Sequence, residues 1–123
     1  MTVMEIGTKL VMLCRARRDA EALSLYDPKA VSVEARASEM VPAVTQGVDA
    51  IRRKGEWWTA NHEIHRGEAK GPFPNGDRFA VIFDYEMTPK IGPMAGQRMQ
   101  MEEVGLYTVA DGKIVREEFF YTT

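Results

Sequence analysis

The sequence predicts an α+β fold in which N-terminal helices cover one face of an antiparallel sheet. Helical periodicity dominates the first half of the chain, whereas most of the second half alternates in the manner of strands. Linkers rich in glycine and proline, at 71–76 and 89–96, divide the second half into separate strands. Helices followed by consecutive strands favour this layered arrangement over a βαβ one.

The first helix is expected over residues 2–18, because apolar residues recur there at spacings of three and four. Thr2 and Glu5 have the spacing of a capping box at its start. The apolar stripe consists of Val3, Ile6, Leu10, Leu13 and Cys14. A second, short helix is expected from Asp19 and should end before Pro28, since a residue that precedes proline avoids the helical conformation.

A third helix is expected over residues 47–58, and it carries both tryptophans of the chain. Its apolar stripe contains Val48, Ile51, Gly55 and Trp58. The charged residues are expected mostly off that stripe, and they are Arg52, Arg53, Lys54 and Glu56. This division predicts one face against the protein and one face toward solvent.

A short strand is expected over residues 30–34, where β-branched residues alternate, and a polar loop should follow it. Four more strands are expected over 62–70, 79–87, 98–109 and 114–121. One side of the strand 79–87 consists of Phe79, Val81, Phe83, Tyr85 and Met87. One face of the sheet is therefore expected to be aromatic and fully covered.

Size and composition bound the possible functions. The 123 residues fit one domain, spanning 1–123. The formal charge of −2 gives no basic surface, so no nucleic-acid partner is expected. A single cysteine, Cys14, cannot form an intramolecular disulfide, which suits a reducing, cytoplasmic location and a buried thiol. Polar residues interrupt the apolar stretch 3–14, so neither a signal peptide nor a membrane partner is expected.

Three segments, taken in order, resemble the SnoaL-like branch of the nuclear transport factor 2-like superfamily. They are LYDPKAVSVE at 25–34, GVDAI at 47–51 and VGLYTVADGKIV at 104–115. The resemblance covers essentially the whole chain and implies a single SnoaL-like domain of cystatin-like fold. In that fold a strongly curved antiparallel sheet wraps around the helices as a cone, with a pocket at the wide end. Many members pair as dimers through the outer sheet face.

Ketosteroid isomerases and polyketide cyclases, the best-characterised relatives, use pocket carboxylates to move protons on apolar ring substrates. The resemblance places Glu34 at the general-base position of the isomerases and Leu10 at the position of their oxyanion tyrosine. Their second donor, and a catalytic histidine of the cyclases, fall near Gly105, while the essential aspartate of the cyclases falls on Phe119. The resemblance thus implies a retained carboxylate without either family's full set of polar groups.

The segment Ala110-Asp111-Gly112-Lys113 predicts a hairpin. A three-residue turn with Gly112 in a left-handed bulge would pair Val109 with Lys113 and Gly105 with Glu117. We expect this turn because the resemblance places the catalytic positions of the family on the face that it produces. One face then carries Met101, Glu103, Gly105, Tyr107, Val115, Glu117, Phe119 and Tyr121. A two-residue turn would break this set, because a one-residue slip moves every side chain to the other face.

Three acids are the predicted catalytic residues: Glu34, Glu103 and Glu117. Carboxyl groups among apolar and aromatic side chains have raised pKa values, which suits a general base. The alternative is that each acid is a solvated edge residue or an ion-pair partner of Arg98 or Arg116.

The predicted ligand-pocket residues are Tyr26, Trp57, Trp58, His62, Phe83, Met101, Tyr107, Phe119 and Tyr121. The aromatic members are equally typical of a plain core. Four methionines are expected to add an adaptable lining: Met87, Met94, Met99 and Met101. His62 and His65 lie three residues apart on a strand and hence on opposite faces, so no metal site is expected, although one of them is a candidate proton carrier.

Two functions are compatible with these residues. The first is a cofactor-free isomerase, cyclase or lyase that acts on a small apolar carbonyl compound, with Glu34 or Glu103 as the base. The second is a non-catalytic protein that binds a small apolar molecule or serves as a dimeric interaction module. We expect neither a metal nor an organic cofactor. A homodimer is expected across the outer sheet face, where Val104, Leu106, Ile114 and Phe120 would form an apolar patch.

Overall fold

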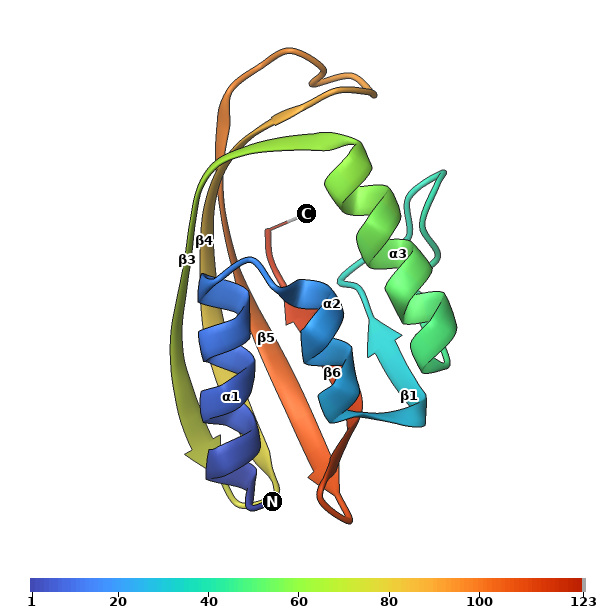
Figure 1. The fold of residues 1–123 in the computed structure, drawn as a ribbon. Coiled ribbons are helices and arrows are strands. Elements are labelled where there is room, and N and C mark those ends of the chain that lie inside the picture. The colour runs from blue at the N-terminus through green and yellow to red at the C-terminus, as the bar shows by residue number, and fades with distance from the viewer. Residues whose placement is uncertain (123) are drawn as a thin grey trace.

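The computed structural model describes residues 1–122, which form three α-helices and six strands (Figure 1). The helices are α1 (Val3–Arg15), α2 (Asp19–Ala22) and α3 (Val48–Ala60), with a 3₁₀ turn at Leu23–Leu25. The strands are β1 (Tyr26–Val33), β2 (Val44–Gln46), β3 (His62–Asn75), β4 (Arg78–Pro89), β5 (Met99–Ala110) and β6 (Lys113–Phe120). The predicted α+β fold class is confirmed.

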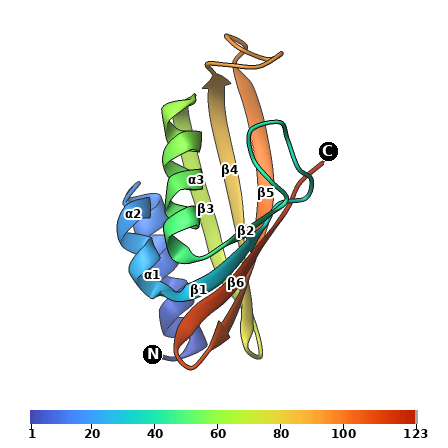
Figure 2. The ribbon, with the colours of Figure 1, turned by 90° about the vertical axis from the view of Figure 1, so that its right-hand side faces the viewer.

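The six strands form one open sheet in the order β2-β1-β6-β5-β4-β3. Neighbouring strands run antiparallel except β1 and β6, which are parallel. The mixed sheet therefore joins a parallel pair to an antiparallel meander. All three helices lie on the same side of this sheet, as Figures 1 and 2 show from two directions. The sheet consequently has an inner face toward the helices and an outer face away from them.

Helix α1 begins with the predicted capping box, in which Thr2 and Glu5 satisfy each other's backbone N–H groups. The helix ends at Arg15, three residues earlier than expected, because the chain turns at Arg17 with a φ of 57°. Its buried residues pack on the sheet. Gly7 permits close approach, since a Cβ there would lie 2.8 Å from the Cβ atom of Pro72.

The segment expected to be a polar loop after β1 contains the short edge strand β2, which pairs with β1 through Ser32 and Thr45. Gly47, with a φ of 90°, turns the chain from β2 into α3. Helix α3 thereby starts at the sheet edge and runs across the inner face (Figure 2). The observed β1 also starts four residues before the predicted strand, at Tyr26.

The turn between β5 and β6 contains two residues, Asp111 and Gly112, with φ values of 50° and 74°. Positive φ at both positions is typical of a type I′ hairpin turn, so the predicted three-residue turn is wrong. Ala110 pairs with Lys113. Further along the hairpin, the partner on β6 lies two residues later than predicted, so that Gly105 pairs with Phe119 and not with Glu117.

An irregularity at Val115 in β6 nevertheless keeps most of the predicted inner face together. It lies between the pairs Val109↔Ile114 and Thr108↔Arg116, so one extra residue on β6 restores the alternation. Tyr107 then lies opposite Glu117, and Gly105 opposite Phe119. The place predicted for Val115 is taken by Ile114, which is fully buried in the core and not part of the outer patch.

Within residues 1–122 no helix is long and apolar enough to span a bilayer.

Candidate functional site

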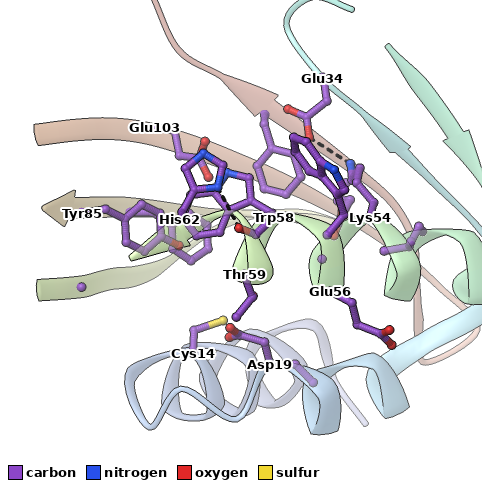
Figure 3. Close-up of a pocket in the computed structure, with 18 of the residues that line it drawn as sticks. Cys14, Asp19, Glu34, Lys54, Glu56, Trp58, Thr59, His62, Tyr85 and Glu103 are labelled. Atoms are coloured by element: carbon purple, nitrogen blue, oxygen red, sulfur yellow. Dashed lines mark hydrogen bonds and ion pairs between the residues drawn. The ribbon is translucent and has the colours of Figure 1, made fainter. Parts of the chain in front are cut away.

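A cavity of about 950 Å³ lies between the helices and the inner face of the sheet. Side chains from α1, α2 and α3 form one wall, and side chains from β1, from the segment 34–41 and from β3 to β6 form the rest (Figure 3). The structure brings all twelve sequence-predicted site residues to this cavity. They are Glu34, Glu103 and Glu117, together with Tyr26, Trp57, Trp58, His62, Phe83, Met101, Tyr107, Phe119 and Tyr121.

Glu117 is the most deeply buried acid of the cavity, with only 4% of its surface exposed. Its carboxyl group accepts hydrogen bonds from the Tyr26 hydroxyl and from Ser32 Oγ, the latter at 2.6 Å. Burial raises the pKa of Glu117, while the hydrogen bonds from Ser32 and Tyr26 and the charge of Lys54 act in the opposite direction. Glu117 is therefore a buried residue of the cavity wall whose carboxyl group is held in place by hydrogen bonds.

Glu34 is held by a cation and a hydroxyl. Lys54 Nζ lies 2.9 Å from Glu34 Oε1, and the Tyr121 hydroxyl donates to Glu34 Oε2 at 3.0 Å. Both side chains of the ion pair are largely buried, with 14% and 19% of their surfaces exposed. Both oxygens of the Glu34 carboxyl group are therefore engaged, one by an ammonium group and one by a hydroxyl.

Glu103 is half-buried on β5 and, within residues 1–122, has no hydrogen bond or ion pair. Burial, together with the charges of Glu34 and Glu117 and against the opposing charge of Lys54, raises its pKa from 4.5 to about 7. Its neighbour Tyr85 has a raised pKa through burial and through the charge of Glu103. Near neutral pH, Glu103 is thus an unpaired carboxyl group that can take up or release a proton.

The sequence analysis missed Lys54 and Ser32. Ser32 Oγ accepts a hydrogen bond from Lys54 Nζ at 2.5 Å, which links the two acids Glu34 and Glu117 through one short chain. The expectation that Lys54 lies off the buried stripe of its helix is wrong. Lys54 lies three residues after Ile51 and four before Trp58, so it shares a side of the helix with these two residues of the cavity wall. This spacing is the signal in the sequence that identifies Lys54.

His62 is fixed by the tryptophans at the end of α3. Its ring stacks on Trp58 with 4.4 Å between ring centroids, and Trp57 meets it edge-on. Nδ1 lies 2.7 Å from the Trp58 carbonyl oxygen. Because a carbonyl only accepts, Nδ1 carries the proton, and Nε2 is left without a partner among the described residues. In the neutral ring, this Nε2 can accept a hydrogen bond from a bound molecule.

His65 lies apart from His62 and contacts Thr88 Oγ1 through its Nε2 atom at 2.7 Å. No group of three or more potential metal ligands occurs in residues 1–122. Of the four methionines expected as lining, only Met101 contributes to the cavity wall. Met87 is buried elsewhere, and Met94 is exposed because it lies in the loop between β4 and β5.

Two of the three positions for which the resemblance implies polar groups in relatives, Leu10 and Gly105, are filled by apolar packing. Leu10 is almost fully buried. At Gly105 a Cβ atom would lie 2.8 Å from the Tyr107 ring and 3.1 Å from the Phe83 ring. Any larger side chain at 105 would displace these buried rings, so the aromatic packing leaves no room there for a polar side chain.

Cys14 and Asp19 face the cavity from the side of α1 and α2, opposite Glu103 in Figure 3. Burial and the nearby charge of Asp19 raise the pKa of the Cys14 thiol to about 12. The thiol therefore stays protonated and is a poor nucleophile. The reactive groups of the cavity are its acids, its lysine and its histidine.

A family model described as the SnoaL-like domain matches residues 1–121. A solved structure from Mesorhizobium loti, described as a candidate SnoaL-like polyketide cyclase, shares 43% identity and a TM-score of 0.89, covering 98% of this chain and 100% of that one. No match was found among curated proteins.

Two more distant structures share the fold. A protein from Catenulispora acidiphila with a ketosteroid isomerase-like fold, in complex with trimethylamine, has 16% identity and a TM-score of 0.73, covering 98% of this chain and 88% of that one. TerC, co-crystallised with polyporic acid, has 18% identity and a TM-score of 0.73, covering 98% and 91%.

Proposed function

The chain belongs to the SnoaL-like domain family, and on this premise we propose that it is a cofactor-free isomerase or cyclase that moves protons on a small apolar carbonyl compound. Glu103 is the general base. The substrate lies among the aromatic side chains of the cavity, and the acidic C–H bond next to its carbonyl group faces the Glu103 carboxylate. The volume of about 950 Å³ suits a molecule of one to a few rings.

The observation that carries this proposal is the unpaired state of Glu103. A general base needs an oxygen that is free to accept the proton and a pKa near the working pH. A carboxyl group without a hydrogen-bond or ion-pair partner meets both needs. Glu34 is engaged by Lys54, and Glu117 by Ser32 and Tyr26. Glu103 alone among the three meets the requirement within the described residues.

The proposed step is an enolisation. Glu103 takes the proton from the carbon next to the carbonyl, and the electrons of the C–H bond form the new carbon–carbon double bond. The electrons of the C=O double bond move onto oxygen. Where the substrate carries a C=C double bond conjugated with the enolate, return of the proton from Glu103 to the far end of the conjugated system gives a double-bond isomer. Attack of the enolate carbon on a second carbonyl of the same molecule closes a ring, and the alkoxide that forms takes the proton back from Glu103. Neither outcome needs an external oxidant or reductant.

The names of structural relatives support the class of ligand. One relative is described as a polyketide cyclase, and two others were crystallised with small organic molecules, trimethylamine and polyporic acid. The aromatic side chains of this cavity, which include Trp57, Trp58 and Phe83, offer apolar surface to such a molecule.

The test is proton exchange on 2-tetralone, an apolar bicyclic ketone, followed in D₂O by NMR. We expect wild-type protein to exchange the protons next to the carbonyl, and Glu103→Gln to slow this by about a hundredfold or more. Glu102→Gln is the matched control, since Glu102 is the exposed neighbour of Glu103 on the same strand. Equal rates for the two variants would contradict the role of Glu103.

A non-catalytic binding protein is the second candidate, and it is favoured by Leu10 and Phe119, which replace polar groups of the catalytic relatives. Both tryptophans of the chain lie in the cavity wall, so their fluorescence reports occupancy. Binding of 2-tetralone without catalysed exchange would favour this candidate over the enzyme.

The proposal includes a homodimer joined through the outer sheet face. Ile82, Val104 and Phe120 occupy directly paired positions of β4, β5 and β6 and form one apolar row. Phe120 is 52% exposed. Burying such a row against its symmetry mate would remove apolar surface from water.

A further inference from the structure

Lys54 holds an ammonium group in the cavity wall, and its contacts leave one donor open. An ammonium has three N–H bonds. One donates to Ser32 Oγ at 2.5 Å and one to Glu34 Oε1 at 2.9 Å. The third has no acceptor among the residues that the structure describes. Nζ also lies 5.5 Å from the centre of the Phe119 ring, a side chain that lines the cavity.

We propose that Lys54 binds the oxygen of the substrate that becomes negative when Glu103 removes the proton, and that the ligand class of the cavity is enolates and phenolates with an apolar body. This inference rests on the proposed function for its reaction. Lys54 then takes the role of the missing oxyanion tyrosine, whose position holds the buried Leu10.

The charges of the site favour this assignment. Before the step, the negative charge is on Glu103, and after it the charge is on the substrate oxygen, while Glu103 is neutral. The net charge of the site does not change, because the negative charge only moves from Glu103 to the substrate oxygen. The step is therefore favoured when the substrate oxygen lies closer to a cation than the Glu103 carboxylate does. Glu103 has no ion pair in the described chain, whereas an oxygen on the third N–H of Lys54 would have one. The interaction is therefore stronger in the transition state than with the neutral ketone.

The buried network fixes the position of Lys54. Ser32 is fully buried, accepts from Lys54 and donates to Glu117, whose other oxygen accepts from the Tyr26 hydroxyl. Ser32 and Glu117 are in this account positioning residues that do not touch the substrate. Because they hold the lysine side chain in advance, little reorganisation is needed as the oxyanion forms.

The test compares 4-nitrophenol with nitrobenzene, which has the same ring but no hydroxyl, as ligands at pH 6. At this pH free 4-nitrophenol is mostly protonated, and its phenolate has a distinct absorption band. We expect wild-type protein to bind 4-nitrophenol with the appearance of the phenolate band. Lys54→Met should lower the affinity for 4-nitrophenol about tenfold or more and change that for nitrobenzene by less than about twofold. Arg53→Met, an exposed neighbour outside the cavity wall, should behave as wild type.

Equal losses for both ligands in Lys54→Met would mean that the lysine only supports the fold, and would overturn the inference. The inference would also be overturned if wild-type protein did not bind 4-nitrophenol, or bound it without the phenolate band. This result needs no variant, so it can be obtained even if Lys54→Met does not fold. The proposed function is judged separately by exchange on 2-tetralone. If Lys54-dependent phenolate binding is found without exchange, the anion site stands and the catalytic proposal falls.

Discussion

Ser32 on β1 and Glu117 on β6 occupy paired positions of the parallel strands, and the serine hydroxyl donates to the carboxyl group at 2.6 Å. The same hydroxyl accepts from Lys54, so it connects a buried acid to the only basic side chain that takes part in this network of described residues. A pair of neighbouring strands thereby fixes a polar network beside the aromatic side chains of the cavity.

Replacing Ser32 with alanine should destabilise the protein. The variant removes two hydrogen bonds and leaves a buried carboxyl group and a buried ammonium each short of one partner. We expect the free energy of unfolding to fall by about 1–3 kcal/mol. Urea unfolding measures this, with the exposed Thr8→Ala as control, which should change stability by about 0.5 kcal/mol or less. Equal effects for the two variants would show that the network adds nothing to stability.

The stability of the protein should fall as the pH rises through neutrality, and Glu103 should be a main cause. Its pKa is about 7 in the folded protein and 4.5 ordinarily, so the folded state binds the proton more tightly. The stabilisation is fully present below about pH 4.5 and is lost as the pH passes 7. Between pH 4.5 and 8 this amounts to about 3 kcal/mol.

Glu103→Gln removes this titration, so its stability relative to wild type should rise by about that amount over the same pH range. Urea unfolding of both proteins at pH 4.5 and pH 8 provides the comparison. A difference between the two proteins that does not change with pH would mean that the pKa of Glu103 is not raised.

The outer apolar row should decide the oligomeric state. Phe120→Asp places a charge in the apolar row of the proposed interface, where burial of an unpaired carboxylate is costly. We expect wild-type protein to sediment as a dimer at micromolar concentration and the variant as a monomer. Met4→Asp, on the exposed side of α1, should remain dimeric. A wild-type monomer at this concentration would rule out the proposed dimer.

The order and type of most elements could be predicted because each carries a local signal. The capping box at Thr2 and the alternation in β4 are examples, and both are observed. Strand β2 could not be predicted, since three residues are too few to show a period. The pairing of β5 with β6 depended on the extra residue at Val115, which no glycine or other turn residue marks in the sequence. Most residues of the inner face were nevertheless predicted correctly. The predicted extra residue in the turn and the observed extra residue in β6 have the same effect on which side chains of β6 face the helices.

The candidate site was partly accessible from sequence for a similar reason. Acids at alternate positions of an apolar strand, such as Glu103 and Glu117, are visible as a pattern. The partners that distinguish them are not, because they come from other elements: Lys54 from α3, and Ser32 and Tyr26 from β1. Whether an acid is paired or free is a property of the assembled cavity, and on that property we propose Glu103 rather than Glu34 as the base.

The central claim is that Glu103 is an unpaired cavity acid with a proton affinity suited to neutral pH. Carboxyl titration by NMR on protein with ¹³C-labelled glutamate side chains, assigned with Glu103→Gln, tests it most directly. We expect Glu103 to titrate with a pKa of about 7 in wild type and higher in Lys54→Met, because the lysine charge lowers this pKa. A midpoint for Glu103 near its ordinary value of 4.5 would contradict the account.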